Sequence, residues 1–279
     1  MKRIKLIVGL VFSFIAVASN AQQLHKVWET DSVFKKPESV VYDASRNVLF
    51  VSSINGNYGA KDGNGFISEV SLDGKIIQVK WMEGLDNPPG LGLYSGKLYV
   101  ADLHRIVVID IAKQLIDTAY TIDSSKYLND ICINEIEEVF VSDIFGNKVY
   151  KLAKKKVEVW SSDPLLNKPN GLLCIKNNLM VLNFGNGTVY KVANDTKAYS
   201  LICTGINNGD GITNDNEDGY FVSGAWQGQI FHVSKDGNKE LVLNLGKDKI
   251  MAADIFYEKS KKLLLVPNLN KSVIAYSWE

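Results

Sequence analysis

Residues 170–192 read NGLLCIKNNLMVLNFGNGTVYKV, and this stretch contains the unit from which most of the chain is built. A polar residue is followed by an apolar run, a turn, a hydrophobic tetrad, a second turn and another β-rich run. The same order recurs at residues 129–152 (NDICINEIEEVFVSDIFGNKVYKL) and 210–233 (DGITNDNEDGYFVSGAWQGQIFHV), with the polar residues 41 and 40 positions apart. A repeat of about 40 to 50 residues with several short strands is typical of a β-propeller.

Aligning the tetrads at residues 49–52, 98–101, 139–142, 179–182, 220–223 and 264–267 gives six units. These units start near Glu38, Pro89, Asn129, Asn170, Asp210 and Ala253. The first unit is longer because it contains an inserted polar, Gly-rich loop at residues 55–65. The last unit ends after three strands, whereas residues 24–29 (LHKVWE) form a strand that belongs to no unit. Pairing of this strand with the last blade would remove an open sheet edge. We therefore predict an all-β, six-bladed β-propeller closed in this way over residues 22–279; five or seven blades are the alternatives.

The N-terminus has the pattern of a cleavable secretory signal at residues 1–21. A basic head (Lys2, Arg3 and Lys5) precedes an apolar run, and small residues stand before the expected cleavage point. The run is shorter than the roughly 20 residues of a membrane-spanning helix, although an uncleaved anchor is the alternative. We expect a periplasmic or secreted protein with no membrane span after cleavage.

Charge and cysteine content restrict the possible partners and metals. Removal of residues 1–21 leaves 28 basic and 31 acidic residues, a net charge of −3, without a basic block, so nucleic acid is not an expected partner. The three cysteines show no Cys-x-x-Cys or Cys/His spacing of a zinc site. They are interpreted as small buried hydrophobic residues, or Cys132 and Cys174 as an inter-blade disulfide.

Four residues with side-chain oxygens occupy one position of the repeat: Glu38, Asn129, Asn170 and Asp210. The innermost strand of each blade lines the axis of a propeller, so residues at the start of these strands should converge on one face. Two carboxylates and two amides suit Ca²⁺, with Mg²⁺ or Mn²⁺ as alternatives, and disfavour Zn²⁺. Taken alone, Asn-Gly or Asp-Gly would indicate a turn. The recurrence at one repeat position favours a divalent-cation site.

The motifs around these four residues resemble those of the SMP-30/gluconolactonase/LRE-like family, six-bladed propellers related to strictosidine-synthase-like and paraoxonase-like proteins. The resemblance covers essentially the whole chain after the signal segment. It rests on Pro37-Glu38, Asn129-Asp130, the PNGL element at residues 169–172 and Asp210-Gly211-Ile212. The PNGL element is the most specific of these matches.

The resemblance implies a metal-dependent lactonase or esterase-like hydrolase that acts on a small-molecule lactone or related ester. By this resemblance Glu38, Asn170 and Asp210 would be the metal ligands. Asn129 would contact the substrate or a metal-bound water, and Asp210 would also be the general base.

Several positions differ from the family pattern. Tyr127 stands where family lactonases often carry a substrate-binding arginine, and Ile131 replaces a glycine. We therefore expect a retained metal site and an altered substrate-binding shell. Arg105, beside His104 in the loop after a second strand, could replace the missing arginine in holding an anionic group; the alternative is a solvated loop charge. Trp226 in the corresponding loop of blade five could support an apolar or sugar face; the alternative is packing between blades.

Two other functions remain open from the sequence. A non-catalytic binding propeller would use the cation as a structural element, consistent with the altered positions around Tyr127. A protein–protein scaffold of the NHL type would carry no ion.

Overall fold

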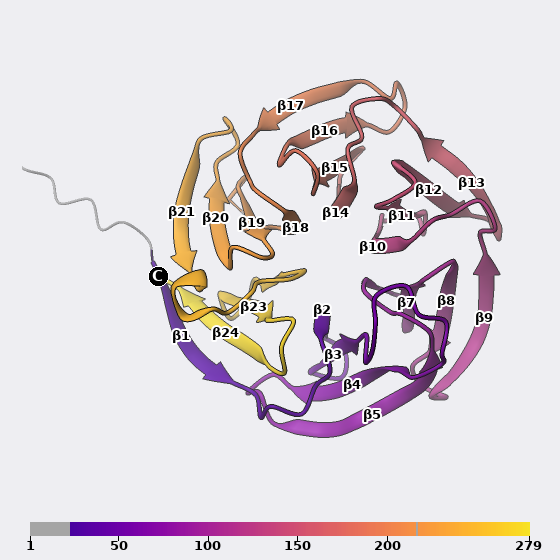
Figure 1. Ribbon diagram of the computed structural model, residues 1–279, viewed down its shortest axis with the longest axis vertical. Helices are drawn as coiled ribbons and strands as arrows, with labels where there is room; N and C mark the ends of the chain where they lie inside the picture. The colour runs from indigo at the N-terminus through magenta and orange to yellow at the C-terminus, as the bar shows by residue number, and fades with distance from the viewer. Residues whose placement is uncertain (1–22, 216) are drawn as a thin grey trace, which may run out of the picture.

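The computed structural model describes residues 23–215 and 217–279, and these form six four-stranded antiparallel sheets. Each sheet is a blade whose strands follow one another outward from the axis (Figure 1). In chain order, the first five blades comprise β2–β5 (Pro37–Asp43, Val48–Ser53, Gly65–Ser71, Ile76–Leu85), β6–β9 (Leu91–Tyr94, Lys97–Asp102, Arg105–Asp110, Leu115–Thr121), β10–β13 (Leu128–Ile133, Val139–Asp143, Lys148–Ala153, Lys156–Ser161), β14–β17 (Pro169–Ile175, Asn178–Asn183, Val189–Ala193, Tyr199–Cys203) and β18–β21 (Gly209–Asn214, Tyr220–Gly224, Gln229–Val233, Lys239–Asn244).

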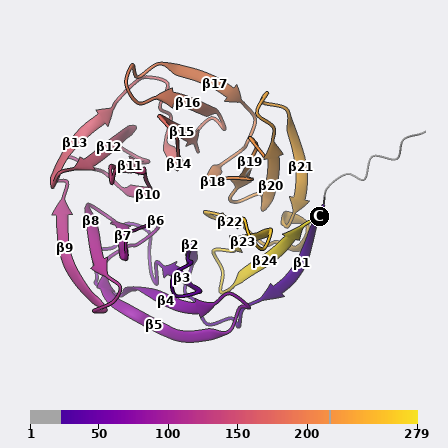
Figure 2. The same cartoon turned by 180° about the vertical axis from the view of Figure 1, so that it is seen from behind.

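The sixth blade contains β22 (Phe256–Glu258), β23 (Leu263–Pro267) and β24 (Val273–Trp278), and its outer strand is β1 (Leu24–Glu29). β1 pairs antiparallel with β24 from Leu24↔Trp278 to Glu29↔Ile274. The two ends of the described chain therefore lie in one sheet (Figure 2). This confirms the predicted fold, blade count and closure. The only helical segment described is the three-residue 3₁₀ turn η1 (Gly246–Asp248).

The hydrophobic core lies between the blades. Six of the buried apolar clusters each combine residues of two neighbouring blades, one cluster for each inter-blade contact around the ring. The predicted tetrads contribute the second strands, whose central residues such as Phe50, Phe140 and Phe221 are fully buried. Burial on both faces explains why these strands read as continuous apolar runs instead of alternating patterns.

The three cysteines are present as free thiols. Cys132 on β10 and Cys174 on β14 pack in the same inter-blade cluster, and burial together with the neighbouring Cys174 raises the pKa of the Cys132 thiol. The predicted signal segment, residues 1–21, lies outside the described residues. Among those described, no helix is long and apolar enough to cross a membrane.

Candidate metal centre and its mouth

The four predicted oxygen ligands all lie in β-bulges at the start of innermost strands. The register shifts between Pro37 and Val40, between Leu128 and Ile131, and at the equivalent places in β14 and β18. The first strands of blades two and six, which carry no such ligand, pair without a shift. A bulge leaves its residue out of the ladder and redirects the side chain. In each of the four blades that carry a predicted ligand, the bulge thus turns the ligand's side chain away from its own sheet.

Buried serines at the ends of three tetrads hold these bulges in place. The hydroxyl of Ser52 accepts a hydrogen bond from the N–H of Ser39, one residue after Glu38, at 3.0 Å. Ser142 accepts from the N–H of Asp130 at 2.9 Å, and Ser223 accepts from the N–H of Gly211 at 2.8 Å. These amides lack a partner strand at the bulge, so the serines satisfy donors that would otherwise be buried without an acceptor.

Glycines after two ligands allow neighbouring innermost strands to approach at backbone contact. A Cβ atom on Gly171 would lie 2.2 Å from the carbonyl oxygen of Asp210. On Gly211 it would lie 2.4 Å from the backbone nitrogen of Ile255. Any larger residue would push β14 from β18, or β18 from blade six. The Gly of the PNGL element therefore has a packing role beside the predicted ligand Asn170.

The oxygens of three predicted ligands are buried without hydrogen-bond partners. Glu38, Asn170 and Asp210 are each at most 4% exposed, and Asn129 is 8% exposed. Glu38 Oε2, Asn170 Oδ1 and Asp210 Oδ1 have no partner; Asn194 Oδ1 and Gln227 Oε1, which are no part of the predicted set, share this property. Native proteins rarely leave such atoms unsatisfied. Two carboxylate oxygens and one amide oxygen are a donor set that fits a hard divalent cation.

Within residues 23–215 and 217–279, no group of three His, Cys, Asp or Glu side chains is arranged to hold a metal ion. A cation at this site would therefore depend on the amide oxygen of Asn170 as its third ligand, beside the carboxylates of Glu38 and Asp210. This dependence makes Asn170 the most informative residue to change.

Two further carboxylates surround the set. The backbone N–H of Asp254 donates to the carbonyl of Glu38 at 3.0 Å, and the Asp254 carboxylate accepts a 2.7 Å hydrogen bond from the Ser39 hydroxyl. Asp130 accepts from the N–H of Leu172 in the next blade at 2.6 Å. Sequence reasoning missed Asp254 because the repeat places Ala253 at the ligand position, and the carboxylate comes one residue later. Asp130 was visible only as the second residue of the Asn-Asp pair.

In the absence of a cation, the negative charges of these carboxylates repel one another. Burial, reinforced by Asp210 and Asp254, raises the pKa of Glu38 well above its usual range. Burial and the charge of Asp254 do the same to the pKa of Asp210, and hydrogen bonding by Asn170 offsets part of the effect. Burial also raises the pKa of Asp254 to about 7, against a smaller lowering by Ser39. A bound cation would relieve these interactions, whereas protons relieve them in its absence.

The inserted loop between β3 and β4 brings Tyr58 toward this set. Partial burial of this residue, followed by the charges of Glu38 and Asp210, raises the pKa of Tyr58 to about 12. The loop is held by the fully buried Asn87, whose Nδ2 donates to the carbonyl of Asn57 at 3.0 Å and whose Oδ1 accepts from the N–H of Gly59 at 3.3 Å.

Tyr127 takes part in the same hydrogen-bond network around Asn87. Its hydroxyl donates to Asn87 Oδ1 at 2.5 Å, and burial followed by the charge of Glu38 raises its pKa strongly. The residue that replaces the family arginine is therefore buried and fastens the inserted loop through Asn87.

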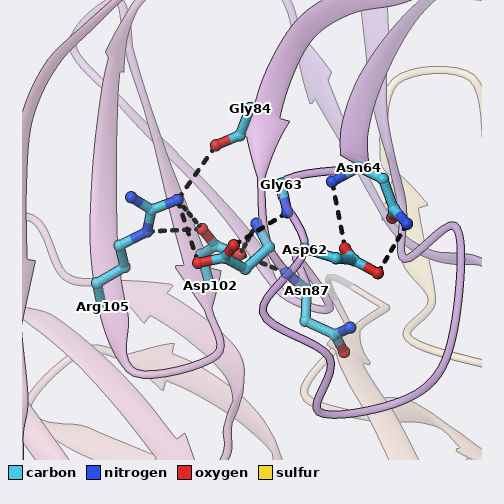
Figure 3. A network of polar contacts seen from close by, with 8 residues as sticks. Asp62, Gly63, Asn64, Gly84, Asn87, Asp102 and Arg105 are labelled. Atoms are coloured by element: carbon cyan, nitrogen blue, oxygen red, sulfur yellow. Dashed lines mark hydrogen bonds and ion pairs between the residues drawn. The ribbon is translucent and has the colours of Figure 1, made fainter.

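Arg105 takes part in a network of ion pairs beneath the same loop (Figure 3). Its guanidinium lies 2.7 Å from the buried carboxylate of Asp102 and 3.6 Å from Asp86, and it donates to the carbonyl of Gly84 at 3.2 Å. Asp102 in turn accepts the backbone N–H groups of Asp86 and Asn87 at 2.8 and 2.6 Å. A cavity of about 140 Å³ adjoins Arg105. The network leaves the arginine partly exposed, but its two acidic partners already balance its charge.

Polar residues at the ends of other second strands have the same architectural role as Asp102. Asp143 accepts the N–H groups of Lys126 and Tyr127, both at 2.9 Å, shortly before Asn129. Asn183 accepts the N–H of Asn167 at 3.0 Å, shortly before Asn170. These side chains position the segment that leads into each ligand.

Trp226 extends from the loop after β19, near the start of β18. It is 64% exposed, and its ring meets that of Phe184 edge to face at 5.3 Å. It therefore contacts a neighbouring blade along one edge and leaves a large surface free at the mouth of the ring.

A second cavity, of about 690 Å³, lies away from this centre. It is bordered by residues of blades two and three, including Tyr99, Tyr120 and Ile136, and by the turn at Lys154 and Lys155. None of the predicted site residues lines it.

Solved structures share this architecture at low sequence identity. A protein assigned to the gluconolactonase family aligns over 94% of this chain and 93% of its own, with a TM-score of 0.72 and 17% identity. A gluconolactonase of Xanthomonas campestris aligns over 93% and 96%, with a TM-score of 0.70 and 12% identity. This chain has the fold of the gluconolactonases. The resemblance inferred from its motifs is thus confirmed for the fold.

A second group of propellers is also similar. A virginiamycin B lyase from Staphylococcus aureus, a catalytically inactive variant bound to quinupristin, aligns over 92% of this chain and 99% of its own, with a TM-score of 0.65 and 12% identity. No protein-family model and no curated protein sequence matches the chain.

Proposed function

We propose that this protein is a divalent-cation-dependent hydrolase of a lactone or a related ester, with Ca²⁺ as the cation that its ligands suit best. The observation that supports this most strongly is the set of buried, unpartnered oxygens on Glu38, Asn170 and Asp210. Hard oxygen donors of mixed charge match calcium better than zinc or copper. The shared fold with gluconolactonases adds support for lactone chemistry.

In this proposal Glu38, Asn170 and Asp210 hold the cation. A divalent cation bound by few protein ligands supplies Lewis-acid polarisation of a carbonyl oxygen. The propeller contributes rigidity, because each ligand sits in a bulge fixed by neighbouring strands. Such fixed geometry is what electrostatic stabilisation of developing charge requires.

The protein's own groups would then position and deprotonate the reactants. Asp210 would accept a proton from the attacking water as the general base. Asn129, the least buried of the four, would hydrogen-bond the substrate through its amide. The high pKa of Tyr58 keeps its hydroxyl protonated near the set, as a hydrogen-bond donor.

Conservative carboxylate changes test the proposal. With Ca²⁺ present, Asp210→Asn should lower kcat/KM on a panel of lactones and esters by about 10²- to 10⁴-fold, the contribution of a general base. Glu38→Gln should lower it by at least about 10-fold, because it removes a ligand of the cation. Asp43→Asn, at the other end of β2, is the matched control and should retain activity. Full activity in both site variants would refute the proposal.

A non-catalytic binding propeller with a structural cation is the second candidate. Two predicted substrate-binding groups favour it, because Tyr127 is hydrogen-bonded to Asn87 and Arg105 is paired with Asp102. A large loss of thermal stability on chelation, without turnover of any lactone or ester, would support this function over hydrolysis.

A lyase comparable to the Staphylococcus enzyme is less consistent with the site. The catalytically inactive variant of that enzyme has alanine in place of one histidine, so its activity needs that histidine. In this chain His232 is paired with Asp215 at 2.6 Å, and His104 with Ser125 at 3.0 Å. Neither belongs to the ligand set.

The proposed site of action is the periplasm or the exterior of the cell, by the secretory pattern at residues 1–21. N-terminal sequencing of the protein purified from its host tests this. A mature chain that still begins at Met1 would contradict it.

A further inference from the structure

Each blade that supplies an oxygen ligand also supplies one aromatic side chain in the loop after its second strand. These residues, here called the aromatic rim, are Tyr58, Phe145, Phe184 and Trp226, from blades one, three, four and five. In blades two and six the corresponding loops carry Leu103 and Leu269 and contain no Phe, Tyr or Trp. The aromatic residues therefore follow the same one-sided distribution as the oxygens.

Strand register places the rim on the same face as the ligands. Leu128, which precedes Asn129, pairs with Asp143, and Phe145 follows two residues later. Likewise Gly209, before Asp210, pairs with Gly224, two residues before Trp226. The loops that leave these positions thus rise from the strand ends where the oxygens lie.

The exposure of the rim is unusual for this protein. Among the Phe, Tyr and Trp residues of the described chain, only Tyr58, Phe145 and Trp226 are exposed, at 57%, 62% and 64%. Exposed apolar groups gathered at one place indicate a binding surface more often than scattered ones do.

The exposed rings are also held in place. Phe145 packs against Tyr127 at 5.8 Å, Trp226 against Phe184 at 5.3 Å, and Lys36 Nζ lies 4.6 Å from the Tyr58 ring. Rings fixed in this way lose little freedom when a ligand stacks on them.

We propose that the aromatic rim binds the flat, hydrophobic body of the substrate, so that the preferred substrate is an aryl or similarly hydrophobic lactone or ester instead of a polyhydroxylated sugar lactone. This inference rests on the proposed function for the reacting carbonyl, which would lie at the ligand set. Aromatic faces favour stacking on planar apolar groups. Two of the polar groups predicted to bind substrate are engaged elsewhere: Arg105 with Asp102, and Tyr127 with Asn87.

Kinetics on two six-membered lactones test the inference. Dihydrocoumarin represents the aryl class and glucono-δ-lactone the sugar class, both assayed with excess Ca²⁺. Phe145→Ala and Trp226→Ala should each raise KM for dihydrocoumarin by about 2- to 12-fold, the value of one aromatic contact, with little change in kcat. Glucono-δ-lactone should be the poorer substrate, with kinetics unaffected by either change. Leu201→Ala, an equally exposed apolar position on β17, is the control and should alter neither reaction.

Binding of coumarin, measured by equilibrium dialysis, separates this inference from the proposed function. If no lactone is turned over but coumarin binds, and the rim variants weaken coumarin binding, the rim inference is supported and the proposed hydrolase function is refuted. If hydrolysis occurs but glucono-δ-lactone is the preferred substrate, or the rim variants do not change KM for dihydrocoumarin, the rim inference is overturned and the hydrolase function is supported. Absence of both turnover and coumarin binding overturns both.

Discussion

Asn87 is predicted to be a main determinant of the ordered inserted loop, and Asn87→Ala should lower both its order and the stability of the protein. The substitution removes two hydrogen bonds to the loop, at Asn57 and Gly59, and leaves the buried Tyr127 hydroxyl without an acceptor. Each lost hydrogen bond costs about 0.5 to 1.5 kcal/mol, and a buried unsatisfied hydroxyl about 1 to 3 kcal/mol. The expected total is about 2 to 6 kcal/mol. At about 2 to 4 °C per kcal/mol for a domain of this size, Tm should fall by roughly 4 to 24 °C.

The assay combines thermal unfolding with hydrogen exchange. Tyr127→Phe removes only one partner and should cost about 1 kcal/mol. The double variant should be less destabilised than the sum of the single variants, because both remove the same hydrogen bond. Exchange should accelerate selectively at residues 55–64. Asn238→Ala, on an exposed turn, is the control. A loss below 1 kcal/mol for Asn87→Ala, with unchanged exchange in the loop, would refute the reasoning.

Other predictions concern protons, packing and charge. Burial raises the pKa of Glu38 and Asp210, so protons on these carboxyls compete with a cation, and the rise in Tm caused by Ca²⁺ should grow from pH 5 to pH 8. In EGTA, the free energy of unfolding should fall as pH rises above about 4, because the carboxyls of the unfolded chain ionise there while those of the folded protein stay protonated. Gly171→Ala should cost about 1 to 3 kcal/mol in urea unfolding and weaken Ca²⁺ binding, because the new Cβ meets Asp210. Arg105→Ala should lower Tm, because it removes the positive charge of the guanidinium beside the buried carboxylate of Asp102. A raised KM with unchanged Tm would instead assign Arg105 to substrate binding.

The repeat was readable from the sequence because it depends on local patterns. The tetrads, the turns between them and the unpaired strand at residues 24–29 define six blades and their closure, as the structure has them. The repeat position of the predicted ligands was also readable, since Glu38 and Asp210 start equivalent strands. What makes these oxygens converge is the bulge and the serine beneath it, and the sequence shows only a Ser at the end of some tetrads.

Contacts between distant segments were not predictable in the same way. Asn87 lies in an ordinary turn sequence, yet it joins the inserted loop to Tyr127 40 residues away. Asp254 reaches Ser39 across the closure of the ring, a separation of 215 residues. Phe145 and Tyr58 look like incidental loop aromatics in the sequence. The pairing of Leu128 with Asp143 places Phe145 at the end of the strands where the predicted ligands lie, and the charges of Glu38 and Asp210 act on Tyr58. Such pairings follow from the geometry of the closed ring, which no single repeat encodes.

Calorimetric titration with Ca²⁺ tests the central claim most directly, namely that the unpartnered oxygens of Glu38, Asn170 and Asp210 hold a divalent cation. We predict saturable binding of one ion per chain, weakened at least about 10-fold by Asn170→Ala, since changes even to outer-shell partners of a metal site cost 10- to 100-fold. Glu38→Gln and Asp210→Asn should weaken it at least as much, and Asp43→Asn should not. Absence of saturable binding of Ca²⁺, Mg²⁺ and Mn²⁺, or binding that all three site variants leave intact, would contradict the account.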